Sequence, residues 1–290
     1  MDAPVNISLI IPYRNAGRTL EQCLVSLQAL RYQQGSISIL LVDNGSTDGS
    51  VEIARRFSEI VQLQEVHPSI YAARNLGASV ATGEILVFTQ ADCVLEPDCV
   101  EQHVAALDKS NGSISVGKQA PIETSPLLSM FEAYEQTRDV WSFGSANWTR
   151  YFGRPKNLAI RRKCFEQYGP FEPVLRGADS LFVQKVARES SCDEITFCPD
   201  AIARQLAVDG LGSFLGYQFQ NSRIMQTLRS SHSAPVQFRD QIRLFRQTTR
   251  EQGYGILRST VLLLLLGLGL LTWKAGKWSA VLLPTKMIDN

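Results

Sequence analysis

Short apolar runs alternate with helical patterns along residues 1–115, and this alternation restricts the fold more than any other feature of the sequence. Four of the runs have the length of buried strands: Ile7–Ile11, Ile39–Val42, Val61–Val66 and Ile85–Thr89. Between them, apolar residues recur at helical spacing, as in Leu20, Leu24 and Leu27. Strands that alternate with helices predict an α/β fold whose mostly parallel sheet carries helices on both faces.

The composition is that of a globular protein, and it excludes several classes of function. Hydrophobic residues make up 44% of the chain and charged residues 20%, which rules out disorder and fibrous repeats. The net charge of +1 argues against a general nucleic-acid-binding protein, because such proteins are usually basic. The six cysteines form no C-x-x-C pair, so we expect reduced thiols in a cytosolic domain.

The pattern becomes less regular after residue 115. We expect helices at 127–141 and 180–190, an extended segment at 157–160 and a brief edge strand at 195–197. No Gly/Ser linker separates independent domains, so residues 1–115 and 116–225 are expected to be two halves of one compact unit. Residues 226–290 follow as a helical tail.

In the tail, an arginine-rich segment is followed by the most apolar stretch of the chain. Eight arginines and three acidic residues lie between Arg204 and Arg258, and the uncharged segment Ser259–Trp273 follows. Its fifteen residues span about 22 Å as a helix, which is short of the roughly 30 Å hydrocarbon core of a bilayer. We therefore favour a membrane-associated helix that is re-entrant or interfacial. A full span is the alternative if Lys274 and Lys277 snorkel and Val281–Leu283 is included, and a buried core helix is a further alternative.

Polar residues follow the predicted strands at the points where those strands end. Tyr13 and Arg14 follow the first run, Asp43 the second and Asp92 the fourth, while Arg74 lies near the start of the helix before the fourth run. Open α/β sheets bind ligands beyond the carboxyl ends of their strands. Carboxylates there can hold a divalent cation, and the cation together with arginine can hold a diphosphate. The sequence thus predicts a site for a nucleoside diphosphate.

Several other catalytic and nucleotide-binding motifs do not occur. The chain contains neither a Walker glycine loop nor a G-x-G-x-x-G motif, so a P-loop or nicotinamide site would lack its phosphate cradle. G-x-S-x-G and H-E-x-x-H are missing too, and the chain has three histidines. Catalysis centred on histidine is therefore not expected.

Four strings of the sequence resemble the successive motifs of family 2 glycosyltransferases with the GT-A fold. They lie within residues 6–190, in the family's order, and read SLIIPYRNAGRTLEQCLVSLQAL, LLVDNGSTDGS, ARNLGASVATGEILVFTQADC and NLAIRRKCFEQYGPFEPVLRGAD. The resemblance implies an inverting enzyme with a Rossmann-like GT-A fold that uses a nucleotide-diphosphate sugar. It also implies a divalent metal ion, Mg²⁺ or Mn²⁺, as cofactor.

The resemblance assigns roles to single residues. Asp43 is expected to contact the nucleoside, Arg74 the nucleotide or its phosphates, and Asp92, the last acid of the metal motif, the metal ion. Asp179 maps to the catalytic base of the later E-D motif. The remaining assignments are the donor-site residues Pro12, Tyr13 and Arg14 and the acceptor-site residues Asn157 and Ala178.

The sequence departs from the family pattern at three places. Gln90 replaces the first acid of the metal motif, Ala178 replaces the acid of the E-D motif, and Arg204-Gln205 stand where a histidine often follows the last strand. These departures predict weakened rather than abolished metal binding. They keep open a catalytically impaired protein that binds nucleotide sugars or acts as a membrane scaffold, and a nucleotidyltransferase is a third candidate.

Some of these residues also have simpler explanations. Asp43 lies in an Asp-Asn-Gly-Ser segment, which is ordinary turn chemistry. Asn157 could satisfy backbone groups instead of touching a substrate. Asp179 could be an acidic residue that the dipole of a helix N-terminus favours.

Together these observations predict a transferase that moves a sugar onto an acceptor hydroxyl with inversion. Residues 1–115 are expected to bind the nucleotide sugar, and residues 116–225 the acceptor, which is lipid-linked or a saccharide. Residues 226–290 are expected to hold the protein on the cytoplasmic face of the cell membrane. The resemblance and the tail together favour a role in cell-envelope or exopolysaccharide assembly.

Overall fold

The computed structural model describes residues 4–67, 69–123, 125–172, 174, 176–208, 210–227 and 236–282 of the chain. The chain forms two compact units, and neither is continuous in sequence. Unit 1 comprises residues 1–120 and 146–206, and unit 2 comprises residues 121–145 and 207–290. The expected segments 1–115, 116–225 and 226–290 have different bounds, because residues 121–145 group with the C-terminal helices. The functions assigned to those segments stay predictions.

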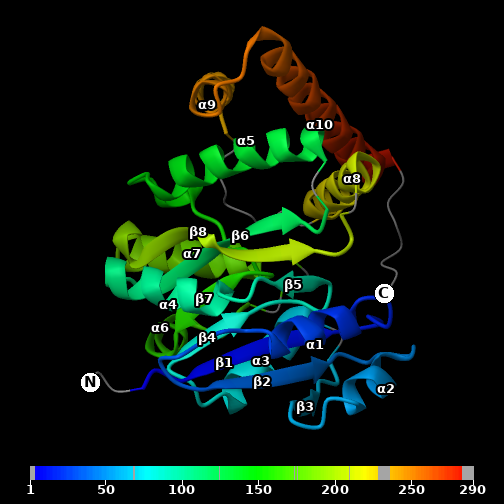
Figure 1. The fold of residues 1–290 in the computed structure, drawn as a ribbon, viewed down its shortest axis with the longest axis vertical. Helices are drawn as coiled ribbons and strands as arrows, with labels where there is room; N and C mark the ends of the chain where they lie inside the picture. Colours follow the sequence, from blue (N-terminus) through cyan, green and yellow to red (C-terminus); the bar gives the residue numbers. More distant parts are fainter. Residues whose placement is uncertain are drawn as a thin grey trace. The chain divides into compact units, whose positions relative to one another are not determined.

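Unit 1 is built on an eight-stranded sheet with the order β3-β2-β1-β4-β7-β6-β8-β5 (Figure 1). The strands are β1 Ile7–Tyr13, β2 Ile37–Asp43, β3 Val61–Gln64, β4 Ile85–Phe88, β5 Cys93–Leu95, β6 Ile114–Pro121, β7 Leu158–Arg161 and β8 Ile195–Gln205. The first four pair in parallel, β1 with β2 and with β4, and β2 with β3. Antiparallel pairs join β4 to β7, β7 to β6 and β5 to β8. The parallel part is the part that the βα pattern of the sequence predicts.

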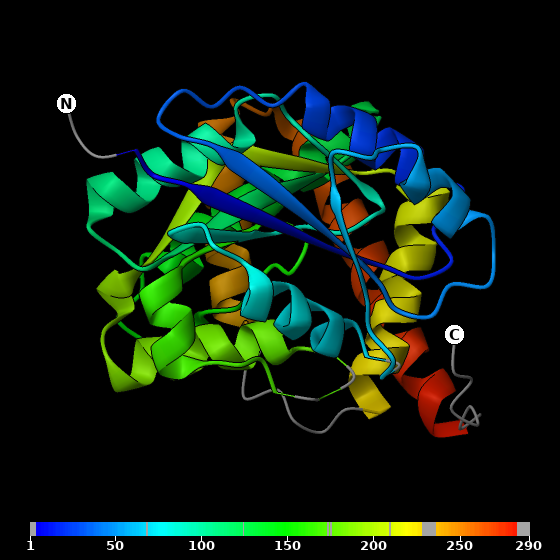
Figure 2. The ribbon, with the colours of Figure 1, turned by 90° about the horizontal axis from the view of Figure 1, so that it is seen from below.

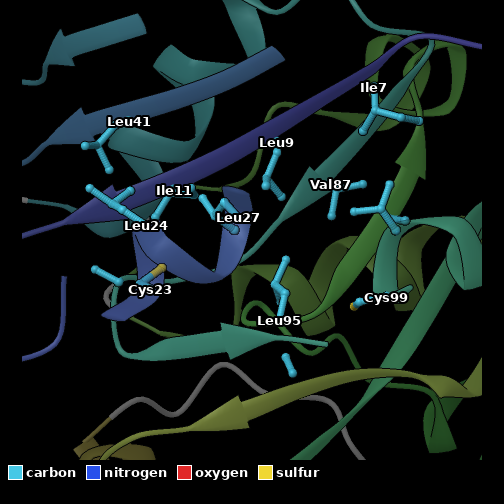
Figure 3. Close-up of a cluster of buried hydrophobic side chains, with 14 of the residues drawn as sticks. Ile7, Leu9, Ile11, Cys23, Leu24, Leu27, Leu41, Val87, Leu95 and Cys99 are labelled. Carbon is cyan, nitrogen blue, oxygen red and sulfur yellow. The ribbon is translucent and has the colours of Figure 1, made fainter. Parts of the chain in front are cut away.

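Helices cover both faces of this sheet (Figure 2). They are α1 Leu20–Gln28, α2 Ser50–Arg55, α3 Ile70–Val80, α4 Cys99–Ser110, α6 Arg162–Tyr168 and α7 Ala178–Glu189, with 3₁₀ turns η1 Trp148–Arg150 and η2 Cys192–Glu194. On one face, alternate residues of β1 such as Leu9 and Ile11 pack with α1, α2 and α4 in the main core (Figure 3). Leu24 and Leu27 of α1 belong to this core, which confirms the helical spacing seen in the sequence. All six cysteines are free thiols.

Aromatic side chains from α3, α6 and α7 pack the opposite face. Phe88 follows the core residue Val87 in β4, so its side chain points to the other side of the sheet. The ring of Phe171 lies 5.2 Å from those of Phe88 and Phe165 and 5.3 Å from that of Phe182. Such edge-on pairs stabilise beyond the area they bury. The cluster joins α6 and α7 to β4, and the tyrosine of α3 in this cluster has its ring 5.8 Å from that of Phe171.

Two elements of unit 1 differ from the expectation. The brief edge strand expected at 195–197 is β8, an eleven-residue strand that lies inside the sheet between β6 and β5. Pro199 and Asp200 interrupt its apolar pattern, so the sequence shows only its first part. The helix expected at 180–190 begins at Ala178, directly after Gly177, whose φ of 83° is a conformation that glycine adopts easily.

Unit 2 contains four helices in its described residues, namely α5 Pro126–Phe143, α8 Leu211–Thr227, α9 Phe238–Glu251 and α10 Ile256–Leu282. Met130 of α5, Leu244 of α9 and Leu262 of α10 share a small core. Helix α8 approaches α10 at Gly276, where an added Cβ would lie 1.9 Å from the Oγ of Ser222. The missing side chain at this glycine therefore permits the close approach of the two helices.

Helix α10 extends beyond the fifteen-residue apolar segment that predicted it. Residues Ile256–Val281 are long and apolar enough to cross a membrane by length and composition alone, and 11% of the most apolar part is buried. Leu263, Leu264 and Leu271 are all more than half exposed. At 1.5 Å per residue, these 26 residues span about 39 Å. The length argument against a full span therefore no longer holds.

Candidate active site

Three neighbouring strands of unit 1 end in register at one edge of the sheet. Tyr13 closes β1 opposite Asp43 of β2, and Asp43 stands opposite Gln64 of β3. Asp43 is buried, and its Oδ1 accepts the N–H of Ser46 at 3.0 Å. Asp43 therefore shapes the turn after β2, as the simpler explanation has it, and also lies where open α/β sheets bind ligands.

The end of β1 brings two further predicted residues to this edge. Tyr13 is buried, and this burial together with the Asp43 carboxylate raises the pKa of its phenol to about 12, so the hydroxyl stays protonated. Pro12 precedes it inside the strand and is buried as well. Arg14 is half-buried, and no residue in the described part of the chain accepts a hydrogen bond from its buried Nε. An anionic ligand would satisfy this donor.

Arg74 of α3 is buried, which is unusual for an arginine. It is 1% exposed, its Nη2 donates to the Pro155 carbonyl at 3.1 Å, and its guanidinium lies 5.1 Å from the ring centre of Tyr71. Burial lowers the pKa of Arg74, and interactions with Tyr71, Asp179 and Asp92 offset part of that shift. Its Nε has no hydrogen-bond partner among the described residues. The charge of Arg74 therefore interacts with the carboxylates of Asp92 and Asp179, and its Nε–H remains available to donate a hydrogen bond to a ligand.

Asp179, the second residue of α7, is held by a tyrosine. It is 3% exposed, and its Oδ1 accepts a short hydrogen bond from the hydroxyl of Tyr71. The N–H of Gly177 donates to the same hydroxyl oxygen at 3.0 Å. Burial raises the pKa of Asp179, although the Tyr71 hydrogen bond and the charge of Arg74 act in the opposite direction. A carboxylate with a raised pKa is a stronger base than an exposed one.

Loop 151–157 covers these charged residues. Gly153 packs so closely on Asp179 that an added Cβ would lie 2.6 Å from the backbone carbonyl carbon of Asp179. The same loop supplies a carbonyl to Arg74 and an ammonium group to Asp92. One short segment thus lies against Arg74, Asp92 and Asp179, three of the five charged residues of the predicted site.

Asp92 pairs with Lys156, a residue that the sequence analysis missed. The Lys156 Nζ lies 2.6 Å from the Asp92 Oδ2 and 3.5 Å from the Gln205 Oε1. Lys156 is 8% exposed, and its carbonyl accepts the hydroxyl of Thr89 at 3.0 Å. The sequence alone could not predict this ion pair, because the two residues are 64 positions apart and no local pattern connects them.

The side chains around Asp92 do not fit a divalent metal ion as they are arranged. Magnesium sites combine one or two carboxylates with phosphate oxygens and water. Here the one carboxylate is paired with the Lys156 ammonium, Gln90 and Gln205 are uncharged, and in the described ranges no three His, Cys, Asp or Glu side chains could hold a metal ion. An ammonium bound to the carboxylate repels a second cation.

The two predicted acceptor residues are buried. Both amide hydrogens of Asn157 are donated, at 2.8 Å each, to the carbonyls of Lys118 and Ala201, and its Oδ1 is 2.8 Å from the Nε2 of His103. Asn157 therefore satisfies core polar groups, as its simpler explanation has it, and we assign it a structural role rather than contact with an acceptor. Ala178 is 1% exposed and has no polar side-chain atom, so its acceptor role stays a prediction.

Tyr71 is the other site residue that the sequence analysis missed, and here a signal exists. It stands three residues before Arg74 on α3, a spacing that places two side chains on one helix face. Because Tyr71 shares a helix face with the predicted phosphate-binding arginine, its phenol could have been predicted as a residue of the active site from the sequence.

Comparison with known proteins places this chain in a family. The sequence profile described as Glycosyl transferase family 2 matches residues 8–178, more than half of the chain. The matched range includes Asp43, Arg74 and Asp92 and ends one residue before Asp179. The base role of Asp179 therefore depends on its geometry and on the resemblance, not on the match.

Individual relatives agree with this assignment. Glycosyltransferase AglE of Haloferax volcanii is 28% identical over 201 residues, which are 68% of this chain and 65% of that protein. The chain thus spans slightly less than two thirds of this relative's length, and it spans 16% of glycosyltransferase GlyA of Streptococcus pneumoniae.

Two solved structures share the fold. The mannosyltransferase PcManGT from Pyrobaculum calidifontis, in complex with GDP-Man and Mn²⁺, aligns with a TM-score of 0.62 at 19% identity, over 96% of this chain and 76% of that one. Glucosyl-3-phosphoglycerate synthase from Mycobacterium tuberculosis, with Mn²⁺, UDP-glucose and phosphoglyceric acid, aligns with a TM-score of 0.56 at 17% identity, over 80% and 81%. These likenesses confirm the expected GT-A-like α/β fold. The chain belongs to glycosyl transferase family 2.

Proposed function

We propose that the protein transfers a sugar from a nucleotide-diphosphate sugar to an acceptor hydroxyl, with inversion at the anomeric carbon. The buried Asp179 carboxylate, with its raised pKa and with Arg74 close by, carries this proposal. A base beside a cation suits a reaction that removes a proton from one group and releases an anion from another. The names of the relatives support sugar transfer as the reaction.

The reaction is a single displacement. Asp179 accepts the proton of the acceptor hydroxyl while that oxygen attacks the anomeric carbon. The bond between the anomeric carbon and the diphosphate oxygen breaks in the same step, so the configuration inverts. Arg74 and Arg14, each with an unpaired Nε among the described residues, bind phosphate oxygens, and Asp43 contacts the nucleoside at the strand ends.

Release of free nucleoside diphosphate from a panel of nucleotide sugars tests the transfer. Replacing Asp179 with Asn should lower the release at least about 100-fold, the usual scale for loss of a positioned base. Asp200→Asn, which changes an exposed carboxylate on β8, is the matched control and should leave the rate unchanged. Wild-type turnover in the Asp179→Asn variant would remove this residue from the mechanism.

The same assay separates the other candidate functions. NMR of the product at the anomeric position distinguishes inversion from retention. Binding of nucleotide sugars without any release favours an impaired protein that acts as a scaffold, for which the replacements at Gln90 and Ala178 are the specific observation. Production of pyrophosphate favours a nucleotidyltransferase.

We propose further that unit 2 binds the cytoplasmic face of the cell membrane. Arginines recur at helical spacing along α9, at Arg239, Arg243, Arg246 and Arg250, and each is worth about 1 kcal/mol near an anionic surface. Leu263, Leu264 and Leu271 of α10 are more than half exposed, and neighbouring exposed leucines are typical of membrane or partner contact. This location favours a lipid-linked or saccharide acceptor and a role in cell-envelope or exopolysaccharide assembly.

Flotation of the full-length protein with vesicles that contain anionic lipid tests the membrane proposal. Leu263→Gln, Leu264→Gln and Leu271→Gln together should release the protein from the vesicles, because all three side chains are exposed. Val25→Gln, Val61→Gln and Val66→Gln, which change exposed apolar residues of unit 1, are the control set. Equal flotation of wild type and the α10 variant would contradict the proposal.

A further inference from the structure

Both carboxylate oxygens of Asp92 have a partner, because its Oδ1 accepts a hydrogen bond from the Cys93 thiol at 3.4 Å and its Oδ2 pairs with Lys156. Its Oδ2 lies 2.6 Å from the Lys156 Nζ, and 27% of its side chain is exposed, compared with 10% for the side chain of Lys156. The Lys156 Nζ also lies 3.5 Å from the Gln205 Oε1. This ion pair is therefore largely shielded at the lysine while it still borders on solvent at the carboxylate.

Lys156 is fixed at both ends of its side chain. Its backbone carbonyl accepts the hydroxyl of Thr89, which directly follows β4, and the next residue, Asn157, is held in the core by four side-chain hydrogen bonds. At the other end, Asp92 binds the ammonium. Surface lysines sample many rotamers, whereas this lysine places its positive charge at one defined point.

A divalent metal ion and the Lys156 ammonium would compete for the same carboxylate oxygen. Both are cations, so a metal ion could bind Asp92 only after it displaced the ammonium. With Gln90 and Gln205 nearby in place of charged ligands, little negative charge remains to favour the metal. An ammonium group is itself a common ligand for phosphate and carries three N–H donors.

We propose that the Lys156 ammonium binds the diphosphate of the donor in place of a divalent metal ion, so that the protein binds its nucleotide without a metal. This inference rests on the proposed sugar transfer and adds to it the group that stabilises the charge on the leaving diphosphate. Asp92 anchors the ammonium and is not a metal ligand. Arg74, whose charge interacts with Asp92, supplies the second cation next to the same carboxylate.

Calorimetric titration of the full-length protein with UDP, GDP, ADP and dTDP, each in EDTA and in Mn²⁺, tests this inference. At least one of these probes should bind in EDTA, and Mn²⁺ should change its Kd by less than about 3-fold. Lys156→Met keeps the length of the side chain, removes the charge, and should weaken binding in EDTA at least about 10-fold, the scale of one charge-assisted contact. Lys156→Arg should restore much of the loss, and Lys163→Met, on the exposed surface of α6, should behave as wild type.

Electron paramagnetic resonance of Mn²⁺ mixed with the protein alone provides a readout that does not depend on activity. Wild type should leave the Mn²⁺ spectrum of free ion unchanged. A double variant, Gln90→Asp with Lys156→Met, should acquire bound Mn²⁺, because it restores a carboxylate and removes the competing cation.

The outcomes separate this inference from the proposed function. Binding that requires Mn²⁺ in wild type, or binding in EDTA that Lys156→Met does not change, overturns the role of Lys156 and leaves sugar transfer standing. Loss of binding in both Lys156→Met and Lys156→Arg shows a packing role and also overturns it. Failure of all four nucleoside diphosphates to bind under either condition counts against the proposed function itself.

Discussion

Burial of Asp179 has opposite effects on chemistry and on stability. Burial raises its pKa, which strengthens it as a base, but a buried charge also costs folding free energy. A carboxyl group with a higher pKa in the folded chain than in the unfolded chain stabilises the fold fully below its ordinary pKa of about 3.9. That contribution is lost as the pH rises through the raised value. The ionised form of Asp179 therefore lowers the free energy of unfolding, and this cost grows as the pH rises above the raised pKa.

Asp179→Asn should abolish most activity and stabilise the protein at the same time. At pH 8 the amide needs no charge in the core, so the thermal midpoint should rise by about 3 °C for each kcal/mol of desolvation that is relieved. The gain should vanish towards pH 4, where the wild-type carboxyl group takes up a proton. Thermal unfolding followed by circular dichroism at pH 4, 6 and 8 measures this, with Asp200→Asn as control. A midpoint at pH 8 below that of wild type would contradict the assignment.

Tyr71→Phe should move the pH dependence of the reaction. The Tyr71 hydroxyl donates to Asp179 and lowers its pKa, so its loss should raise that pKa further. We expect the acid limb of the kcat/KM profile to shift to higher pH by about one unit, with near wild-type rates on the alkaline side. Tyr134→Phe, a buried tyrosine of unit 2, is the control. A uniform loss of rate at every pH would instead indicate that Tyr71 serves packing alone.

His103 should make the fold sensitive to mild acid. It is buried between the Ser115 Oγ and the Asn157 Oδ1, and burial lowers its pKa to about 4. The unfolded chain protonates its histidine near pH 6.5, so stability should fall by about 3 kcal/mol as the pH drops from 6.5 to 4. His103→Gln should flatten this slope in urea titrations at pH 7, 6 and 5, whatever its effect at pH 7. An unchanged slope would show that other groups govern the acid response.

At the scale of elements, loop 151–157 determines how the charged residues meet. It closes over Asp179 through Gly153 and reaches Asp92 through Lys156. Gly153→Ala should shift this loop, because the new Cβ would lie 2.6 Å from backbone rather than from a flexible side chain. We expect a loss of about 1–3 kcal/mol in the free energy of unfolding, measured by urea titration, and a lower transfer rate.

Gly49→Ala is the matched control for this loop variant. An added Cβ at Gly49 meets no heavy atom within 4 Å, so stability and rate should stay close to wild type. A Gly153→Ala protein as stable and as active as this control would show that the loop does not need its close contact with Asp179.

The spacing of apolar residues along the chain determined which helices and strands could be predicted from the sequence. The β1 and α1 elements follow directly from apolar spacing, whereas β8 is longer than its pattern because Pro199 and Asp200 interrupt it. Helix α10 continues through Lys274 and Lys277, since lysine is a good helix former even though it ends an apolar run.

The same distinction holds for the site. Asp43 and Asp92 could be expected at one edge because parallel strands end together, and Arg74 because it lies near the start of the helix before the fourth strand. The pairing of Lys156 with Asp92 depends on two segments that only the folded chain brings together.

At the scale of the whole molecule, the chain leaves unit 1 after residue 120, forms α5, and returns to unit 1 at residue 146. The rest of unit 2 follows only after residue 206. No long Gly/Ser linker marks any of these three crossings, which explains why the sequence predicted three consecutive segments. Each unit is completed by residues that are distant in sequence, and the chain passes between the units at residues 120–121, 145–146 and 206–207.

The position of α5 has a consequence for synthesis on the ribosome. Its core residues Met130 and Tyr134 precede their partner Leu244 by about 110 residues, and a ribosome that adds 5–20 residues per second needs roughly 6–20 s for that interval. Unit 1 can complete its own sheet meanwhile, since its last strand ends at Gln205. During that interval Met130 and Tyr134 of α5 stay exposed to solvent on the nascent chain, because Leu244 has not yet been synthesised. Chaperones or neighbouring nascent chains can bind this exposed apolar surface. Yield of the folded protein should therefore depend on the rate of translation between α5 and α9.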